Sequence, residues 1–182
     1  MILMRPRDTI EAFDSFLLER GLSLEAVVIG GAALGLLGVV SRQTRDCDIL
    51  HPLLPKEIRD AAMEFAVLRR AEGEALDDDW LNNGPASLAD DLPDGWNRRL
   101  QVAFSGKAII LRSLGRMDLL QSKVFALCDR GIDIQDCIAL KPTAAELDEL
   151  LPWLKVQDAN PMWPDHVGTV LGDLKKRLGH GL

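Results

Sequence analysis

The feature that most constrains the fold is an apolar segment that ends in two glycines and is followed by two closely spaced aspartates. Residues 27–29 are Val-Val-Ile, Gly30 and Gly31 come next, and Asp46 and Asp48 follow with one residue between them. In a strand, alternate side chains point to one face, so both carboxylates share a face with backbones about 6 to 7 Å apart. Paired carboxylates favour a bound cation, and oxygen ligands suit Mg²⁺ or Mn²⁺ together with substrate phosphates. The pattern predicts a divalent-metal site beside a glycine turn.

The length and charge of the chain limit the classes to which it can belong. With 182 residues, 47% of them hydrophobic, the chain is long enough for one core with a small helical lobe. We expect an α/β core over residues 1–115 and a helical lobe over residues 116–182, packed together as one compact unit. The net charge of −7 argues against an extended basic surface for nucleic acid, while a small local basic site is compatible with it.

Cysteine usage and hydropathy predict the compartment. The three cysteines show no Cys-x-x-Cys spacing, which disfavours both a disulfide framework and a zinc site and indicates a reducing, cytoplasmic environment. Every apolar run is broken by a charge or a glycine before it reaches 18 residues, so we expect a soluble protein without a membrane partner.

Hydrophobic periodicity predicts the elements of the first 115 residues. Residues 99–104 and 107–111 read as strands joined by a two-residue hairpin at Ser105-Gly106, so the sheet is not purely parallel. The other expected elements are a helix capped by Asp8 or Thr9 and stopped by Gly21, a strand over 24–29, a buried helix over 32–40, a helix over 55–70 and a long loop over 77–95.

The remainder of the chain reads as helical. Thr143 and Glu146 form a capping box for one helix, which Pro152 is expected to end. The expected helices are 117–130, 134–140, 143–151 and 167–178, with an irregular segment over 153–164.

Two interpretations of the glycine and aspartate motif stay open at this point. In the functional one, Gly30 and Gly31 let a phosphate approach the backbone and the amides that begin the following helix, with Arg42 and Arg45 adding positive charge. In the structural one, the glycines only turn the chain and the aspartates pair with these arginines.

Three cations recur at seven-residue spacing along the helix expected over 117–130. Arg116, Lys123 and Arg130 lie on one line, with Leu119 and Ala126 on one side of it and Leu120 and Leu127 on the other. A lysine in an apolar stripe needs an anionic partner, since an unpaired buried charge is costly. That partner is either a protein carboxylate such as Asp133 or Asp136, or a bound triphosphate; a third alternative is that the side chains extend to water.

Taken together, these motifs resemble the nucleotidyltransferase superfamily, and most closely its AbiEii toxin-like and DUF6036 subgroup. The superfamily pattern is a Gly-Gly or Gly-Ser turn followed by Asp-x-Asp or Asp-x-Glu on the next strand. The resemblance is carried by the segments 30–50, 80–85 (Trp-Leu-Asn-Asn-Gly-Pro) and 118–123, with Arg130 and residues 133–136 beyond.

The resemblance implies an α+β fold, with a mixed β-sheet flanked by helices and a C-terminal helical lobe. It implies that Asp46 and Asp48 are catalytic and hold Mg²⁺ or Mn²⁺ while a nucleotidyl group passes from an NTP to a hydroxyl of RNA or protein. It further implies a place in a toxin–antitoxin pair, with tRNA or another RNA as acceptor and a cognate antitoxin or toxin as partner. The residues implied to contact the nucleotide are Gly30, Gly31, Arg42, Thr44 and Lys123.

The sequence departs from the superfamily in one respect. A third carboxylate is usual on a later central strand, and neither strand expected over 99–104 and 107–111 contains one. Asp77, Asp78 or Asp79 can substitute from the preceding loop. The alternative is a non-catalytic module on the same fold that binds a nucleotide or a partner protein, as an antitoxin does. A metal-dependent phosphohydrolase also uses paired aspartates but fits the glycine pair and intervening helix poorly.

Overall fold

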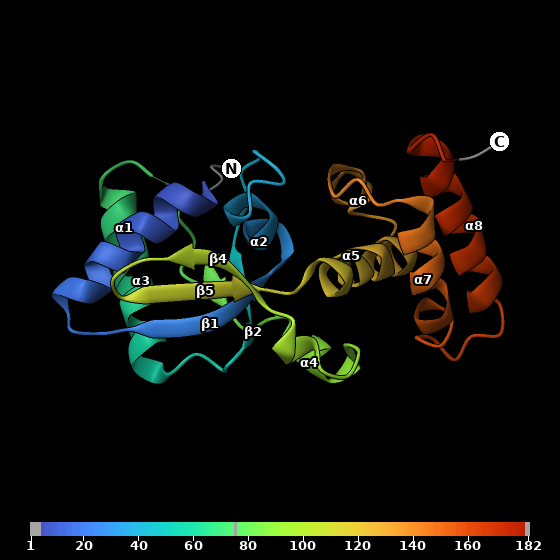
Figure 1. Ribbon diagram of the computed structural model, residues 1–182. Helices are drawn as coiled ribbons and strands as arrows, with labels where there is room; N and C mark the ends of the chain where they lie inside the picture. The colour runs from blue at the N-terminus through green and yellow to red at the C-terminus, as the bar shows by residue number, and fades with distance from the viewer. Residues whose placement is uncertain (1–4, 75, 181–182) are drawn as a thin grey trace. The chain divides into compact units, whose positions relative to one another are not determined.

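A mixed five-stranded sheet organises the first part of the chain. The computed structural model describes residues 5–74 and 76–180, and the chain divides into two units, Met1–Gly115 and Arg116–Leu182. The sheet, in the first unit, has the strand order β3-β2-β1-β5-β4 (Figure 1). Its strands are β1 Leu24–Ile29, β2 Cys47–His51, β3 Leu81–Asn82, β4 Gln101–Ser105 and β5 Ile109–Ser113.

Both strand directions occur in this sheet. β1 pairs antiparallel with β2 and parallel with β5, β2 pairs parallel with β3, and β4 and β5 form an antiparallel hairpin. The mixed sheet with flanking helices confirms the predicted α+β class.

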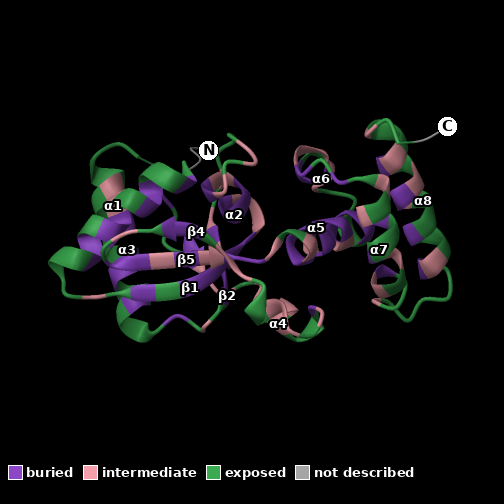
Figure 2. Ribbon diagram, in the orientation of Figure 1, coloured by how far each residue is buried: buried purple, intermediate pink, exposed green. Residues whose placement is uncertain are grey.

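Two helices cover one face of the sheet and form the main core with it. These are α1 Pro6–Glu19 and α3 Lys56–Ala71, and the shorter elements are α2 Gly30–Leu36, α4 Leu88–Asp91 and the 3₁₀ turn η1 Trp96–Arg98. The ring of Phe13 on α1 lies 5.1 Å from that of Phe65 on α3 and 5.1 Å from that of Trp80, measured between centroids. Buried and exposed residues recur along α1 (Figure 2), and the buried ones, such as Phe13 and Leu17, belong to the main core.

Several chain segments meet at one end of the sheet, here called the site end. The end of β1 pairs with the start of β2 through Ile29 and Asp48, and Asp48 is in register with Asn82 of β3. The end of β5 is held between β1 and the start of β4, because Ser113 is in register with both Val28 and Gln101. Since α1 finishes just before β1 begins, the first turn of α1 also lies toward the site end.

Asp14 joins α1 to the opposite end of the sheet. Its carboxylate accepts three backbone hydrogen bonds from the β4–β5 connection: from Lys107 at 3.1 Å, Ala108 at 2.8 Å and Ile109 at 2.7 Å. Burial alone would raise the pKa of Asp14, but these donors outweigh it and hold the pKa below its ordinary value. The connection therefore spans three residues, where two were predicted, because three amides converge on one carboxylate.

Other element boundaries in the first unit also differ from the predictions. The helix α1 begins at Pro6, with Arg5 as its N-cap, because proline suits the first helical position. The glycine pair belongs to the first turn of α2, which ends four residues before the predicted Val40. The segment 77–95 is not one loop, because Trp80 is buried and its carbonyl accepts the Cys47 amide at 2.5 Å, which draws β3 into the sheet.

The second unit consists of helices. They are α5 Arg116–Arg130, α6 Ile134–Ala139, α7 Ala144–Leu154 and α8 Trp163–Arg177. The Thr143 and Glu146 capping box is confirmed, but Pro152 does not end α7, because the buried Leu150 and Leu154 keep its last turn packed. In the described residues of both units, no helix combines the length and the apolar character needed to cross a lipid bilayer.

Protein carboxylates meet all three cations on the predicted line of α5. Arg116 pairs with Glu146, with a 2.6 Å N···O distance, and Arg130 pairs with Asp133 at 3.8 Å. Lys123 is only 6% exposed, and its ammonium lies 2.8 Å from Asp136 and 3.5 Å from Asp133. Lys123 therefore pairs with protein carboxylates, which is the first of the three alternatives that the sequence left open.

We expect Asp14→Asn to lower the free energy of unfolding at pH 7 by about 1 to 3 kcal/mol, because the amide NH₂ would face one of the backbone donors. Since the pKa of Asp14 is lower in the folded state, its contribution is present above the unfolded pKa and is lost as the pH falls through the folded one. Urea titrations should show the difference from wild type constant near neutral pH and narrowing below pH ~4. Glu11→Gln, an exposed change on the same helix, is the control; an equal effect of both variants would contradict this role for Asp14.

We expect Lys123→Met to destabilise the second unit by about 3 kcal/mol or more, because it leaves the 1% exposed Asp136 without its cation. Lys176→Met removes a lysine whose side chain is 72% exposed and should cost under ~1 kcal/mol. Thermal unfolding measures both. If Lys123→Met unfolds at the wild-type temperature, the ion pair contributes nothing to folding.

Candidate active site

The centre of the candidate site is the contact between Gly30 and Asp48. Gly30 follows β1 directly and has a φ of +71°, a left-handed conformation that side chains other than glycine adopt at a cost. A Cβ atom at this position would lie 2.9 Å from the Oδ2 atom of Asp48. The absence of a side chain at Gly30 therefore makes room for the carboxylate that the next strand presents.

Asp46 and Asp48 flank a residue that belongs to the core. Cys47 is fully buried among the side chains between the sheet and its helices, while Asp46 and Asp48 are half-buried. Burial raises the pKa of the Cys47 thiol well above its ordinary value, and the charges of Asp48 and Asp46 raise it further. Cys47 is thus a neutral core residue, and the alternation of a strand directs the acid at position 48 away from the core.

The second glycine gives space to two other predicted residues. A Cβ atom on Gly31 would lie 3.2 Å from the hydroxyl of Thr44 and 3.6 Å from a guanidinium nitrogen of Arg42. Thr44 also donates a hydrogen bond to the carbonyl of Asp46 at 3.4 Å, which ties the loop before β2 to the aspartate motif. The structure thus brings together Gly30, Gly31 and the residues at 42, 44 and 48.

Asn82 is a polar residue of the site that the sequence analysis did not single out. It stands in register with Asp48 on the neighbouring parallel strand, so both side chains lie on the same face. The Gly84 amide donates to the side-chain oxygen of Asn82 at 2.7 Å, and the Asn82 amide donates to the carbonyl of Asp79 at 3.2 Å. The signal for it was present in the Asn-Asn-Gly sequence of the segment 80–85.

The next asparagine and Trp80 have structural roles. Asn83 donates to the carbonyls of Ile49 at 2.9 Å and Pro52 at 3.0 Å and accepts from the Leu54 amide at 2.7 Å. The Trp80 indole donates to the carbonyl of Ala62 on α3 at 3.1 Å. This motif therefore fixes the path of the chain on both sides of β2.

No third carboxylate accompanies Asp46 and Asp48 in the later strands. Neither β4 nor β5 contains an acidic residue, and the described part of the chain holds no group of three or more histidines, cysteines or acids placed to bind a metal together. Residues 77–79 precede β3 and therefore lie toward the site end. Asp77 is 3.9 Å from Arg45, and Asp78 is 2.5 Å from Arg70.

Lys123 belongs to the second unit, where Asp133 and Asp136 are its partners. Its contact with a nucleotide stays a prediction.

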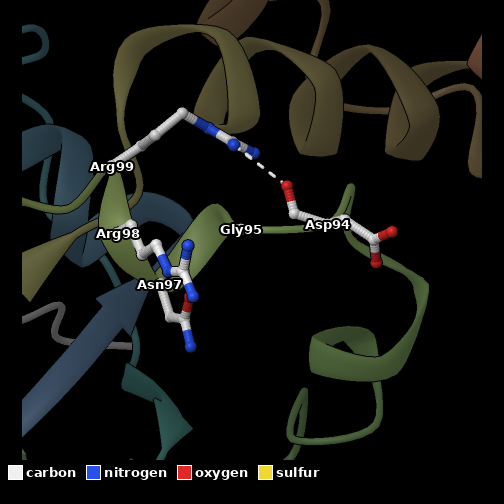
Figure 3. A pocket seen from close by; sticks show the side chains of 5 residues that line it. All are labelled: Asp94, Gly95, Asn97, Arg98 and Arg99. Atoms are coloured by element: carbon white, nitrogen blue, oxygen red, sulfur yellow. Dashed lines mark hydrogen bonds between the residues drawn. The ribbon is translucent and has the colours of Figure 1, made fainter.

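A pocket of about 520 Å³ lies next to the start of β4, lined by residues 94, 95 and 97–99. Arg99 donates to the carbonyl of Asp94 at 3.0 Å, while the side chains of Asn97 and Arg98 lie beside each other (Figure 3). Because β4 begins at the site end, this pocket brings two cations to the same end of the sheet as Asp48.

Comparisons with solved structures and with protein families found proteins that are similar to this chain. A crystal structure of an antigenic nucleotidyltransferase-like protein from Paracoccidioides brasiliensis matches with a TM-score of 0.51 and 14% identity, covering 98% of this chain and 94% of that one. At this identity the match shows the fold alone. No curated protein matches the chain. The model of a family described as nucleotidyltransferase of unknown function (DUF6036) matches residues 8–148, which include both β1 and the aspartate motif. The chain therefore belongs to the DUF6036 family of nucleotidyltransferases.

Proposed function

We propose that the protein is a Mg²⁺-dependent nucleotidyltransferase that moves a nucleotidyl group from an NTP to a hydroxyl of RNA or protein. The observation that carries the proposal is the carboxylate of Asp48 held against the left-handed Gly30 where β1 passes into α2. The family to which the chain belongs supports the reaction class.

The donor set fits a hard divalent cation. Asp46, Asp48 and the amide oxygen of Asn82 are oxygen ligands, which Mg²⁺ and Mn²⁺ prefer. We assign Asp46 and Asp48 as the residues that would hold the metal. The metal, when bound, would neutralise charge at the reacting phosphorus and position the attacking and leaving oxygens.

The residues beside the acids suit the phosphates of the nucleotide. Gly30 and Gly31 begin α2, where the first backbone amides of a helix lack carbonyl partners within the helix. Without side chains at these positions, a phosphate can approach the backbone closely. Arg42 and Thr44, which lie against Gly31, add a charge and a hydroxyl donor.

In the proposed reaction, the acceptor oxygen forms a bond to the α-phosphorus of the NTP. The bond from that phosphorus to the bridging oxygen breaks, pyrophosphate leaves, and the proton of the hydroxyl passes to water. Asp46 and Asp48 would contribute by holding a cation beside the reacting phosphorus, where negative charge develops, and such electrostatic stabilisation is the larger part of catalysis in phosphoryl transfer.

The resemblance to AbiEii toxins extends the proposal to a toxin–antitoxin pair, with RNA, tRNA among them, as acceptor and a cognate protein as partner. The second candidate is a non-catalytic module that binds a nucleotide or a partner protein on the same fold. The absence of acidic residues from β4 and β5 favours it.

Label transfer separates the two candidates. Purified protein is incubated with Mg²⁺, each labelled NTP, and either total RNA or cell protein as acceptor. We expect Asp46→Asn and Asp48→Asn each to lower transfer at least about a hundredfold, because each removes a metal ligand worth several kcal/mol in the transition state. Asp60→Asn, an exposed change on α3, should retain wild-type transfer. Nucleotide binding by a wild type that transfers no label to either acceptor would favour the non-catalytic module.

Two glycines with nearly equal φ angles test the role of Gly30. Gly38 has a φ of +73° and nothing within 4 Å of the position of its Cβ, whereas Gly30 has Asp48 at 2.9 Å. Both Gly30→Ala and Gly38→Ala should lower the free energy of unfolding by about 1 to 2 kcal/mol through left-handed strain. Only Gly30→Ala should also abolish label transfer, since the methyl group displaces the Asp48 carboxylate. Equal activity of the two folded variants would show that this contact is not needed.

A further inference from the structure

A second basic pocket lies beside the candidate site. It has a volume of about 470 Å³ and is lined by residues 5–8 at the start of α1 and by Gly35 and residues 40–43 between α2 and β2. This volume is within the range of small-molecule sites in proteins. Three of the lining residues are arginines, Arg5, Arg7 and Arg42, and one is an acid, Asp8.

One face of α2 connects this pocket to the glycine pair. Gly31 and Gly35 are four residues apart and therefore lie on the same face of the helix. Gly31 faces Arg42, and a Cβ atom on Gly35 would lie 2.9 Å from the ring of Pro6. The rise of an α-helix puts these two glycines about 6 Å apart. The pocket thus extends from the candidate nucleotide site toward the first turn of α1.

Arg5, the N-cap of α1, and Arg7, in its first turn, have exposed side chains that a ligand can reach. The Arg5 guanidinium is 3.8 Å from Asp8 and that of Arg7 is 4.0 Å from Glu11, and all four side chains are more than half exposed. Such loose surface pairs contribute little to stability. Arg7 also donates to the carbonyl of Leu36 at 2.8 Å, which holds its guanidinium close to the end of α2.

The chemistry of the pocket indicates the ligand. One guanidinium group can bind two oxygens of a phosphate at once. Three guanidinium groups line this pocket, although the chain as a whole has a net charge of −7. We propose that this pocket is a second phosphate-binding subsite, in which Arg5 and Arg7 hold a substrate phosphate other than the one that reacts. This inference rests on the proposed function. The phosphate belongs either to the nucleotide or to the backbone of an RNA acceptor.

Calorimetry with three probes tests the subsite. The probes are inorganic tripolyphosphate, ATP with Mg²⁺, and a short single-stranded RNA. We expect Arg5→Gln/Arg7→Gln to weaken tripolyphosphate binding at least about tenfold, since two charge-assisted contacts are lost. Because Arg7 contacts Leu36, thermal unfolding is measured for the double variant, and Arg5→Gln alone, which loses only a loose pair, should also weaken binding.

The matched control is Lys56→Gln/Lys107→Gln. This control also removes two positive charges, but from exposed lysines at the other end of the sheet. Lys56 lies at the start of α3, and Lys107 lies in the β4–β5 connection. Its affinity for all three probes should stay within about twofold of wild type, because distant exposed charges are screened. An equal loss in this control would mean that only net charge matters, and would overturn the subsite.

The other two probes distinguish the sources of the phosphate. A parallel loss of ATP affinity would assign the subsite to the nucleotide. A loss of RNA affinity with ATP unchanged would assign it to the acceptor, and the slope of log K against log salt should then fall by about 1.4, or 0.7 for each contact removed. Unchanged affinities for all three probes, or no binding of any probe by wild type, would show that the inference is wrong.

Failure of the proposed function gives a different result. An Asp46→Asn/Asp48→Asn protein keeps the arginines, so it should bind tripolyphosphate whether or not the wild type transfers a nucleotide. Arginine-dependent binding in a wild type that transfers no label would uphold the subsite and reject the catalytic proposal.

Discussion

The candidate site depends on the close approach of one carboxylate to one backbone. Asp48 can occupy its place because Gly30 has no side chain and takes a left-handed conformation. The same glycine lets β1 pass directly into α2, so the turn of the chain and the position of the acid have one cause. Antiparallel pairing of β1 with β2 then brings Asp48 level with Ile29, at the point where the chain leaves the sheet.

The sheet brings several other chain segments to the end at which Asp48 lies. β1 lies in the middle of the five strands, and the ends of its neighbours bring Asn82, the loop at 77–79 and the arginines before β4 to the same end. At the other end, Asp14 fixes the β4–β5 connection to α1. Because α1 is held there, its first turn and the arginines at 5 and 7 have a defined place beside α2.

The sequence predicted those parts of the fold whose signals are local. Residues 24–29 are apolar except for the exposed Glu25, and they form a strand with the expected bounds. The capping box at Thr143 was also sufficient to locate the start of a helix. The signals failed where distant contacts decide: β3 exists because Cys47 binds the carbonyl of Trp80, and the hairpin has an extra residue because Asp14 attracts its amides. Similarly, the sequence limited Lys123 to a few partners, but only packing could select Asp133 and Asp136.

For the site, the motif identified the residues that meet at Gly30 and Gly31, while Asn82 required the strand register.

The position of Cys47 between two acids has a consequence for how the sheet assembles. Sliding β2 by one residue along β1 would turn the Cys47 thiol outward and the Asp48 carboxylate toward the core that contains Phe13 and Trp80. Burying an unpaired carboxylate in that core would be costly. The Asp48 carboxylate that we assign to the metal site therefore also favours the observed register of β2 on β1 over one shifted by a single residue.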